Sequence, residues 1–230
     1  MITPGTPRSR LAEEIRLIKR RLLQDLIADP QAGAAGRVFM VTSARPSEGK
    51  SFIALNLALS LITDENLPVV LVEADVLRPN ILNMLGQPPS PGLAELFRDP
   101  SVDLADATLH DAMLNLTVIP AGHKVPAGTE FFLGQGMRDL FERLRVRYPG
   151  AVILFDSPPV LATTEALTLA HLADAVLLVV EAGRTSRSAV ESAIELLAPC
   201  RNVGMVLNKL PEFDVAEHFG TYYHDYVTKR

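Results

Sequence analysis

The sequence predicts an α/β domain with a central, mostly parallel, doubly wound sheet and helices on both faces. Three observations support this prediction. Short apolar runs alternate along the chain with amphipathic segments, which is the order expected of strand–helix units. The first apolar run leads into a loop that ends in Gly49, Lys50 and Ser51. Two later runs end in acidic residues, at the strand ends where open parallel sheets bind ligands.

Composition limits the class of protein. The chain has 230 residues, 48% of them hydrophobic, so it can bury the core of one domain. Its formal net charge of -5 argues against a nucleic-acid partner. The single cysteine, Cys200, excludes an internal disulfide and suits a reducing compartment. No apolar run reaches the ~18 residues of a membrane span, and the first residues lack the apolar core of a signal peptide. We therefore expect a cytoplasmic protein that reaches the membrane only through a partner.

The predicted elements fall into three segments. Residues 1–35 form an N-terminal helix and linker, residues 36–211 the nucleotide-binding domain, and residues 212–230 a tail that holds three of the four tyrosines. Apolar runs predict strands at 38–41, 67–73, 114–120, 151–155, 173–180 and 203–207. Helical patterns cover 9–28, 52–62, 129–148, 163–172 and 189–197, and Thr185 or Ser186 caps the last of these. Residues 80–113 are expected to form short helices and loops.

Residues 36–51 have the order of a phosphate-binding P-loop: strand, loop, Gly-Lys-Ser and helix. In such a loop the backbone N–H groups and the helix N-terminus face an anion. Lys50 supplies a point charge for the β- and γ-phosphates, and Ser51 a hydroxyl for Mg²⁺. Ala44 and Ser47 stand where Gly is common, but both keep their N–H groups. A chance Gly-Lys-Ser turn is the alternative, and the strand before and the helix after argue against it.

These considerations define the predicted nucleotide contacts. A further contact is expected at the end of the last strand, where an Asn can hydrogen-bond an adenine edge, although a turn is nearly as good an interpretation there. The predicted contacts are Ala44, Arg45, Pro46, Ser47, Glu48, Gly49, Lys50, Ser51, Phe52 and Asn208.

Acidic residues follow two of the predicted strands. Glu73 and Asp75 lie at positions i and i+2, so both side chains are expected on one side, within reach of a phosphate-bound metal. Alternatively, one of them caps the next helix. Asp156 follows the strand at 151–155 and is predicted to hold Mg²⁺ through water or to orient the attacking group. Its alternative is a simple turn at Asp-Ser-Pro-Pro.

The two ends of the chain carry further candidate sites. In the first helix, Glu13, Arg16 and Lys19 occur at three-residue steps, beside an apolar stripe. From the residues alone, packing on the domain is preferred over contact with another protomer. In the tail, the tyrosines either anchor a docked helix or accept phosphate, and composition does not separate these possibilities. They are Tyr222, Tyr223 and Tyr226.

With these motifs in place, the chain resembles the bacterial tyrosine kinases of the polysaccharide co-polymerase system. It is most similar to the stand-alone, exosortase-associated tyrosine autokinases. The likeness covers about residues 9–210 and lies in residues 42–51, 71–79 and 155–161, with support from 120–122, 128–132 and 206–209.

The resemblance implies ATP and Mg²⁺ as cofactors and assigns roles to the motif residues. Lys50 and Ser51 match the Walker A residues, Glu73 and Asp75 the two acids of a second Walker motif, and Asp156 the Walker B acid. Asp75 then binds Mg²⁺ or takes the tyrosine proton. The implied catalytic residues are Lys50, Glu73, Asp75 and Asp156, and the implied metal ligands are Ser51, Asp75 and Asp156.

The resemblance also implies partners. Glu13, Arg16 and Lys19 match an oligomerisation motif, so the family likeness favours a homo-oligomer such as a ring, with tail tyrosines phosphorylated between protomers. The implied activator is the cytoplasmic segment of a transmembrane polysaccharide co-polymerase, and the implied output is control of exopolysaccharide chain length or export.

Three departures from the family pattern keep other functions open. Glu73 replaces the usual Asp, Leu77 stands where many members have Arg, and the tyrosine cluster is short. One alternative is a dimerising ATPase switch like the septum-site and plasmid-partition ATPases, in which Arg45 would replace a lysine that reaches across the dimer. Another is a non-catalytic, ATP-binding regulator of the membrane partner.

Overall fold

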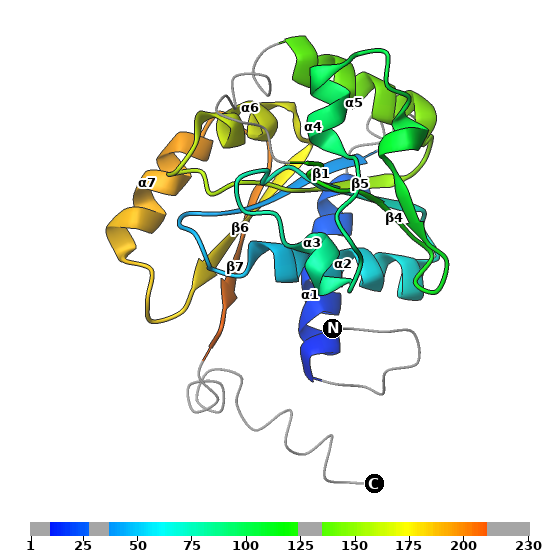
Figure 1. Cartoon of the computed structure of the whole chain (residues 1–230). Helices are drawn as coiled ribbons and strands as arrows, with labels where there is room; N and C mark the ends of the chain where they lie inside the picture. Colours follow the sequence, from blue (N-terminus) through cyan, green and yellow to red (C-terminus); the bar gives the residue numbers. More distant parts are fainter. Residues whose placement is uncertain (1–9, 28–36, 124–134, 211–230) are drawn as a thin grey trace, which may run out of the picture.

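The computed structural model describes residues 10–27, 37–123 and 135–210 (Figure 1). Within this part, seven strands form one sheet in the order β3-β4-β2-β5-β1-β6-β7. All neighbours are parallel except β3 and β4, which confirms the predicted mostly parallel sheet. The strands are β1 (Arg37–Ser43), β2 (Val69–Glu73), β3 (Leu109–Asp111), β4 (Leu116–Ile119), β5 (Val152–Asp156), β6 (Ala175–Glu181) and β7 (Val203–Asn208). Strand β3 was not predicted, because its three residues are at most half-buried and show no apolar alternation.

Helices cover both faces of the sheet, as predicted (Figure 1). The predicted helix at 129–148 is described only from Gln135, since residues 124–134 lie outside the described part. The helix at 187–197 is capped by Ser186, whose hydroxyl accepts from the Ala189 N–H. The helical elements are α1 (Arg10–Ile27), α2 (Lys50–Glu65), α3 (Ile81–Met84), α4 (Leu93–Arg98), η2 (Leu104–Ala107), α5 (Gln135–Arg147), α6 (Thr164–Leu172) and α7 (Arg187–Leu197).

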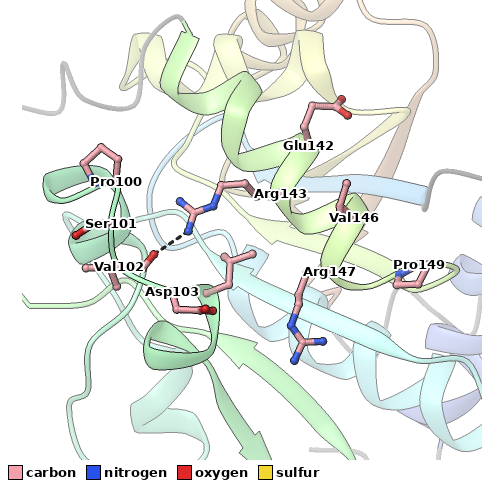
Figure 2. A pocket seen from close by; sticks show the side chains of 10 residues that line it. Pro100, Ser101, Val102, Asp103, Glu142, Arg143, Val146, Arg147 and Pro149 are labelled. Carbon is pink, nitrogen blue, oxygen red and sulfur yellow. Dashed lines mark hydrogen bonds between the residues drawn. The ribbon is translucent and has the colours of Figure 1, made fainter.

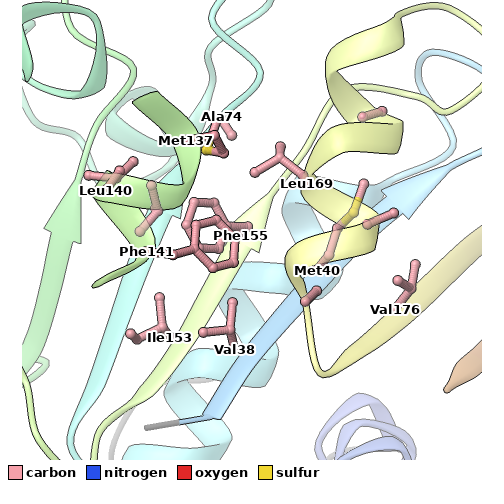
Figure 3. Close-up of a cluster of buried hydrophobic side chains, with 14 of the residues drawn as sticks. Val38, Met40, Ala74, Met137, Leu140, Phe141, Ile153, Phe155, Leu169 and Val176 are labelled. Carbon is pink, nitrogen blue, oxygen red and sulfur yellow. The ribbon is translucent and has the colours of Figure 1, made fainter. Parts of the chain in front are cut away.

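Strand alternation divides the core into two layers. On β1, Val38 and Met40 face the layer covered by α5, α6 and α7, whereas Phe39 faces the layer covered by α2. In the first layer the rings of Phe141 and Phe155 stack with centroids 4.8 Å apart (Figure 3). Because both faces of the sheet are buried, the strands are near-continuous apolar runs, as parallel sheets require.

Helix α1 covers α2. From Ile53 to Ile62 every residue of α2 is buried, which is expected of a helix enclosed on all sides. The predicted apolar stripe of α1 packs against the α2 layer, through Leu11, Ile15, Ile18 and Leu22. None of the described helices combines the length and hydropathy needed to cross a bilayer.

Candidate active site

The P-loop joins β1 to α2. The strand ends at Ser43 and the helix begins at Lys50, so residues 44–49 form the turn between them. Two of these residues have positive φ angles, Ser47 at 70° and Gly49 at 97°. Such angles turn the backbone sharply, which lets successive N–H groups line a concave surface.

Lys50 lies between two of the predicted acids. Its Nζ is 2.8 Å from Oδ2 of Asp75 and 3.6 Å from Oδ1 of Asp156. Its side chain is only 9% exposed. Strands β2, β5 and β1 are neighbours and parallel, so the residues at their carboxyl ends meet at one edge of the sheet. The structure thus brings together three residues that are 25 or more positions apart in the chain.

The electrostatics of this cluster are set by burial and by the opposite charges. Burial raises the pKa of Asp156 to about 6, although the positive charge of Lys50 opposes the shift. Burial lowers the pKa of Lys50, but Asp156 and Asp75 outweigh it, so the net shift is upward. Lys50 therefore stays charged, while a pKa of about 6 lets the carboxyl of Asp156 take up a proton in mildly acidic solution.

Asp156 and Ser51 fit a magnesium ion. Among the described residues, neither carboxylate oxygen of the buried Asp156 has a hydrogen-bond partner. Oxygen donors of this kind are what Mg²⁺ prefers, and the ion usually needs only one or two protein carboxylates besides phosphate and water.

Glu73 does not face Lys50. One of its carboxylate oxygens accepts from the N–H groups of Asn80 and Ile81, the latter at 2.6 Å, and the other accepts from the Ala121 N–H at 3.1 Å. It therefore caps the start of α3 and ties it to the end of β4, which is the capping alternative considered for one of the two acids.

The side-chain amide of Asn208 makes a hydrogen bond to the P-loop backbone. Its Nδ2 donates to the Glu48 carbonyl at 2.8 Å. Beside it, Lys209 Nζ donates to the Ser47 carbonyl at 2.7 Å and pairs with Oε2 of Glu181 at 3.1 Å. These contacts of Lys209 are not predicted from the sequence, although a lysine directly after a strand-end Asn is a usable signal.

Thr185 was predicted as a possible helix cap, but its hydroxyl donates to the buried carboxylate of Glu48. The other oxygen of Glu48 accepts from the Arg45 N–H at 2.7 Å. The Glu48 side chain thus braces the P-loop internally and against the loop that precedes α7.

No protein-family model matches the chain. The succinoglycan biosynthesis transport protein ExoP of Rhizobium meliloti is 31% identical over 96% of this chain, which spans 29% of ExoP. The tyrosine-protein kinase YwqD of Bacillus subtilis is 29% identical over 96% of this chain and 91% of YwqD. The solved kinase domain of VpsO matches with a TM-score of 0.72 and 29% identity, over 88% of this chain and 100% of that one. By sequence and fold, the chain is similar to bacterial tyrosine kinases.

A further bacterial tyrosine kinase supports the fold. The kinase domain of ETK from Escherichia coli has a TM-score of 0.79 at 24% identity, over 91% of this chain and 79% of that one. The P-loop α/β architecture is therefore shared with solved kinase domains.

The predicted oligomerisation residues of α1 pair within their own chain. Lys19 Nζ lies 2.9 Å from both Asp64 and Glu65 of α2, and its side chain is 5% exposed. Arg16 contacts Glu13 at 2.6 Å and Asp64 at 3.3 Å. Lys19 is thus inside the α1–α2 contact, whereas Glu13 and Arg16 remain partly accessible.

A cavity of about 840 Å³ lies between the η2 region and α5, away from the cluster of Lys50, Asp75 and Asp156 (Figure 2). Its lining includes no P-loop residue and none of the three acids. Arg143 in its wall donates to the Val102 carbonyl at 2.8 Å (Figure 2). The predicted acceptor tyrosines, Tyr222, Tyr223 and Tyr226, lie outside the described residues.

Proposed function

We propose that this chain is an ATP-dependent protein-tyrosine autokinase that regulates the chain length and export of an exopolysaccharide. The convergence of Lys50, Asp75 and Asp156 beside the P-loop carries the proposal, because phosphoryl transfer depends on positioning and charge stabilisation. The named tyrosine kinases among its relatives support the same activity, and ExoP supports the link to polysaccharide.

Each residue of the cluster has a distinct role in this proposal. The P-loop N–H groups and Lys50 bind the phosphates of ATP, and Lys50 compensates the charge that develops during transfer. Ser51 and Asp156 would hold Mg²⁺, which neutralises phosphate charge when bound. Once the polyphosphate attracts Lys50, Asp75 is released from its 2.8 Å ion pair and can accept the proton of the incoming tyrosine hydroxyl.

The acceptors in this proposal are Tyr222, Tyr223 and Tyr226 of another protomer in a homo-oligomer. Glu13 and Arg16 are the accessible part of the α1 motif and would make the protomer contact. The protein would work in the cytoplasm, at the inner face of the membrane, activated by the cytoplasmic segment of a transmembrane polysaccharide co-polymerase. The motif residues 42–51, 71–79 and 155–161 support assigning it to the stand-alone, exosortase-associated branch of these kinases.

The test is mass mapping of the full chain after incubation with Mg-ATP, with and without the partner's cytoplasmic segment. Phosphate on the tail tyrosines of the wild type, absent in Lys50→Ala, is the expected result. An unmodified tail, with ATP hydrolysis and ATP-dependent dimerisation, would instead identify a dimerising ATPase switch. ATP binding without either chemistry would identify a non-catalytic regulator.

A further inference from the structure

The last residue of the edge strand β7 and the residue that follows it contact the P-loop backbone. Asn208 Nδ2 donates to the Glu48 carbonyl at 2.8 Å, and Lys209 Nζ donates to the Ser47 carbonyl at 2.7 Å. Lys209 is itself held by Glu181, at the end of the neighbouring strand β6, at 3.1 Å. Asn208 and Lys209 therefore anchor the carbonyl groups of two consecutive peptides of the loop.

Because the peptide group is planar, holding a carbonyl also fixes the direction of the N–H group in the same peptide. In a trans peptide the C=O of one residue and the N–H of the next point in opposite directions. Fixing the carbonyls of Ser47 and Glu48 toward β7 therefore turns the N–H groups of Glu48 and Gly49 away from it. None of the described residues accepts a hydrogen bond from these two N–H groups. They stay available to an anion bound in the loop.

The backbone at this junction requires such support. Ser47 has a φ of 70° and Lys209 a φ of 57°, in a region that residues with a side chain seldom adopt. Conformations of this kind persist when surrounding contacts over-determine them. At Gly49 a Cβ would lie 2.2 Å from Asn208 Nδ2, so the glycine permits the close approach of the Asn208 amide.

We infer that Asn208 and Lys209 are positioning residues that hold the P-loop in its anion-binding form. The Asn208 amide then serves the loop carbonyl rather than an adenine edge. This inference rests on the nucleotide site of the proposed function, but not on tyrosine phosphorylation.

The test compares Mg-ATP with Mg-tripolyphosphate, which has the phosphates but no adenine, by calorimetric titration of the full chain. The variants are Lys209→Met and Asn208→Ala. Arg201→Met, an exposed basic residue just before β7, is the matched control. We expect Lys209→Met and Asn208→Ala each to weaken both ligands by a similar factor, about tenfold. The control should bind both as the wild type does.

A loss of affinity for Mg-ATP alone would show that these residues contact the adenine, and it would overturn the inference. Unchanged affinity for both ligands would also overturn it. Glu181→Gln provides an independent variant if Asn208→Ala does not fold, since it leaves both positioning side chains in place. It should give a smaller loss that is again equal for the two ligands, and Lys209→Arg should retain most of the wild-type affinity.

The outcome is separable from that of the proposed function. A wild type that binds both ligands but phosphorylates no tyrosine leaves the positioning role standing. A wild type that binds neither ligand overturns both.

Discussion

Glu73 and Asp75 lie two residues apart at the end of β2, yet their carboxylates face different partners. Asp75 pairs with Lys50 at 2.8 Å, whereas Glu73 accepts from backbone N–H groups of Asn80, Ile81 and Ala121. The strand ends at Glu73, so the alternation rule no longer places Asp75 on the same side. One acid thus pairs with the P-loop lysine, and the other holds the loops around it.

Glu73→Gln should lower the free energy of unfolding by about 1–3 kcal/mol. Glutamine keeps one acceptor oxygen, but its NH₂ group would face a backbone donor. Urea unfolding of the nucleotide-free protein measures the change. The control is Glu142→Gln, because Glu142 is 70% exposed in a surface pair with Arg145 and should change stability little. Equal unfolding curves for wild type and Glu73→Gln would contradict the capping role.

Asp156→Asn should remove a specific part of the pH dependence of stability. The pKa of Asp156 is raised to about 6 in the folded protein, chiefly by burial, from a usual value of 3.8. Its protonated form is therefore favoured by folding, and this stabilisation is present below pH ~4 and lost as the pH rises through ~6. The loss is on the order of 3 kcal/mol.

Urea unfolding of the nucleotide-free wild type and variant is measured from pH 4 to pH 7. At each pH the two free energies of unfolding are subtracted, so that the contributions of the other carboxyl groups cancel. The wild type should lose stability relative to Asp156→Asn across this range. Parallel curves would show that Asp156 titrates normally. In the wild type, affinity for Mg-ATP should rise over the same interval, because a cation requires the ionised carboxylate.

Lys19→Met should destabilise the fold by about 1–3 kcal/mol, because it leaves Asp64 and Glu65 without their shared cation at the α1–α2 contact. Arg10→Met is the matched control, since Arg10 pairs with Glu14 on the exposed side of the same helix. Urea unfolding and sedimentation should be measured together. Wild-type stability combined with a lost oligomer would instead assign Lys19 to a protomer contact.

Gly49→Ala should cost more stability than Gly86→Ala. Both glycines have positive φ, but a Cβ at Gly86 meets nothing within 4 Å, whereas at Gly49 it would displace the Asn208 amide from the Glu48 carbonyl. The strained backbone should lower the free energy of unfolding by about 1 kcal/mol in each variant. Gly49→Ala should lower it by about 1 kcal/mol more, because it also breaks the hydrogen bond from Asn208 to the Glu48 carbonyl. In an Asn208→Ala background this extra cost should vanish when measured by thermal unfolding. Equal costs in both backgrounds would contradict the coupling.

Much of the site follows from local patterns. The P-loop order at residues 36–51 and the acids Asp75 and Asp156 after buried strands predicted the cluster around Lys50, and the structure confirms that these residues meet. Parallel strands carry their carboxyl ends to one edge, so residues that follow neighbouring strands meet there whatever their spacing in the chain.

The chain's residue patterns therefore determined the fold class, the position of the phosphate-binding loop and the residues at the strand ends. Tertiary structure decided which partners the side chains of Glu73, Asn208 and Lys19 contact. Their partners, Ala121, Glu48 and Asp64, come from segments between 45 and 160 positions away. Those contacts depend on strand order and helix packing, and no periodicity or spacing along the sequence encodes them.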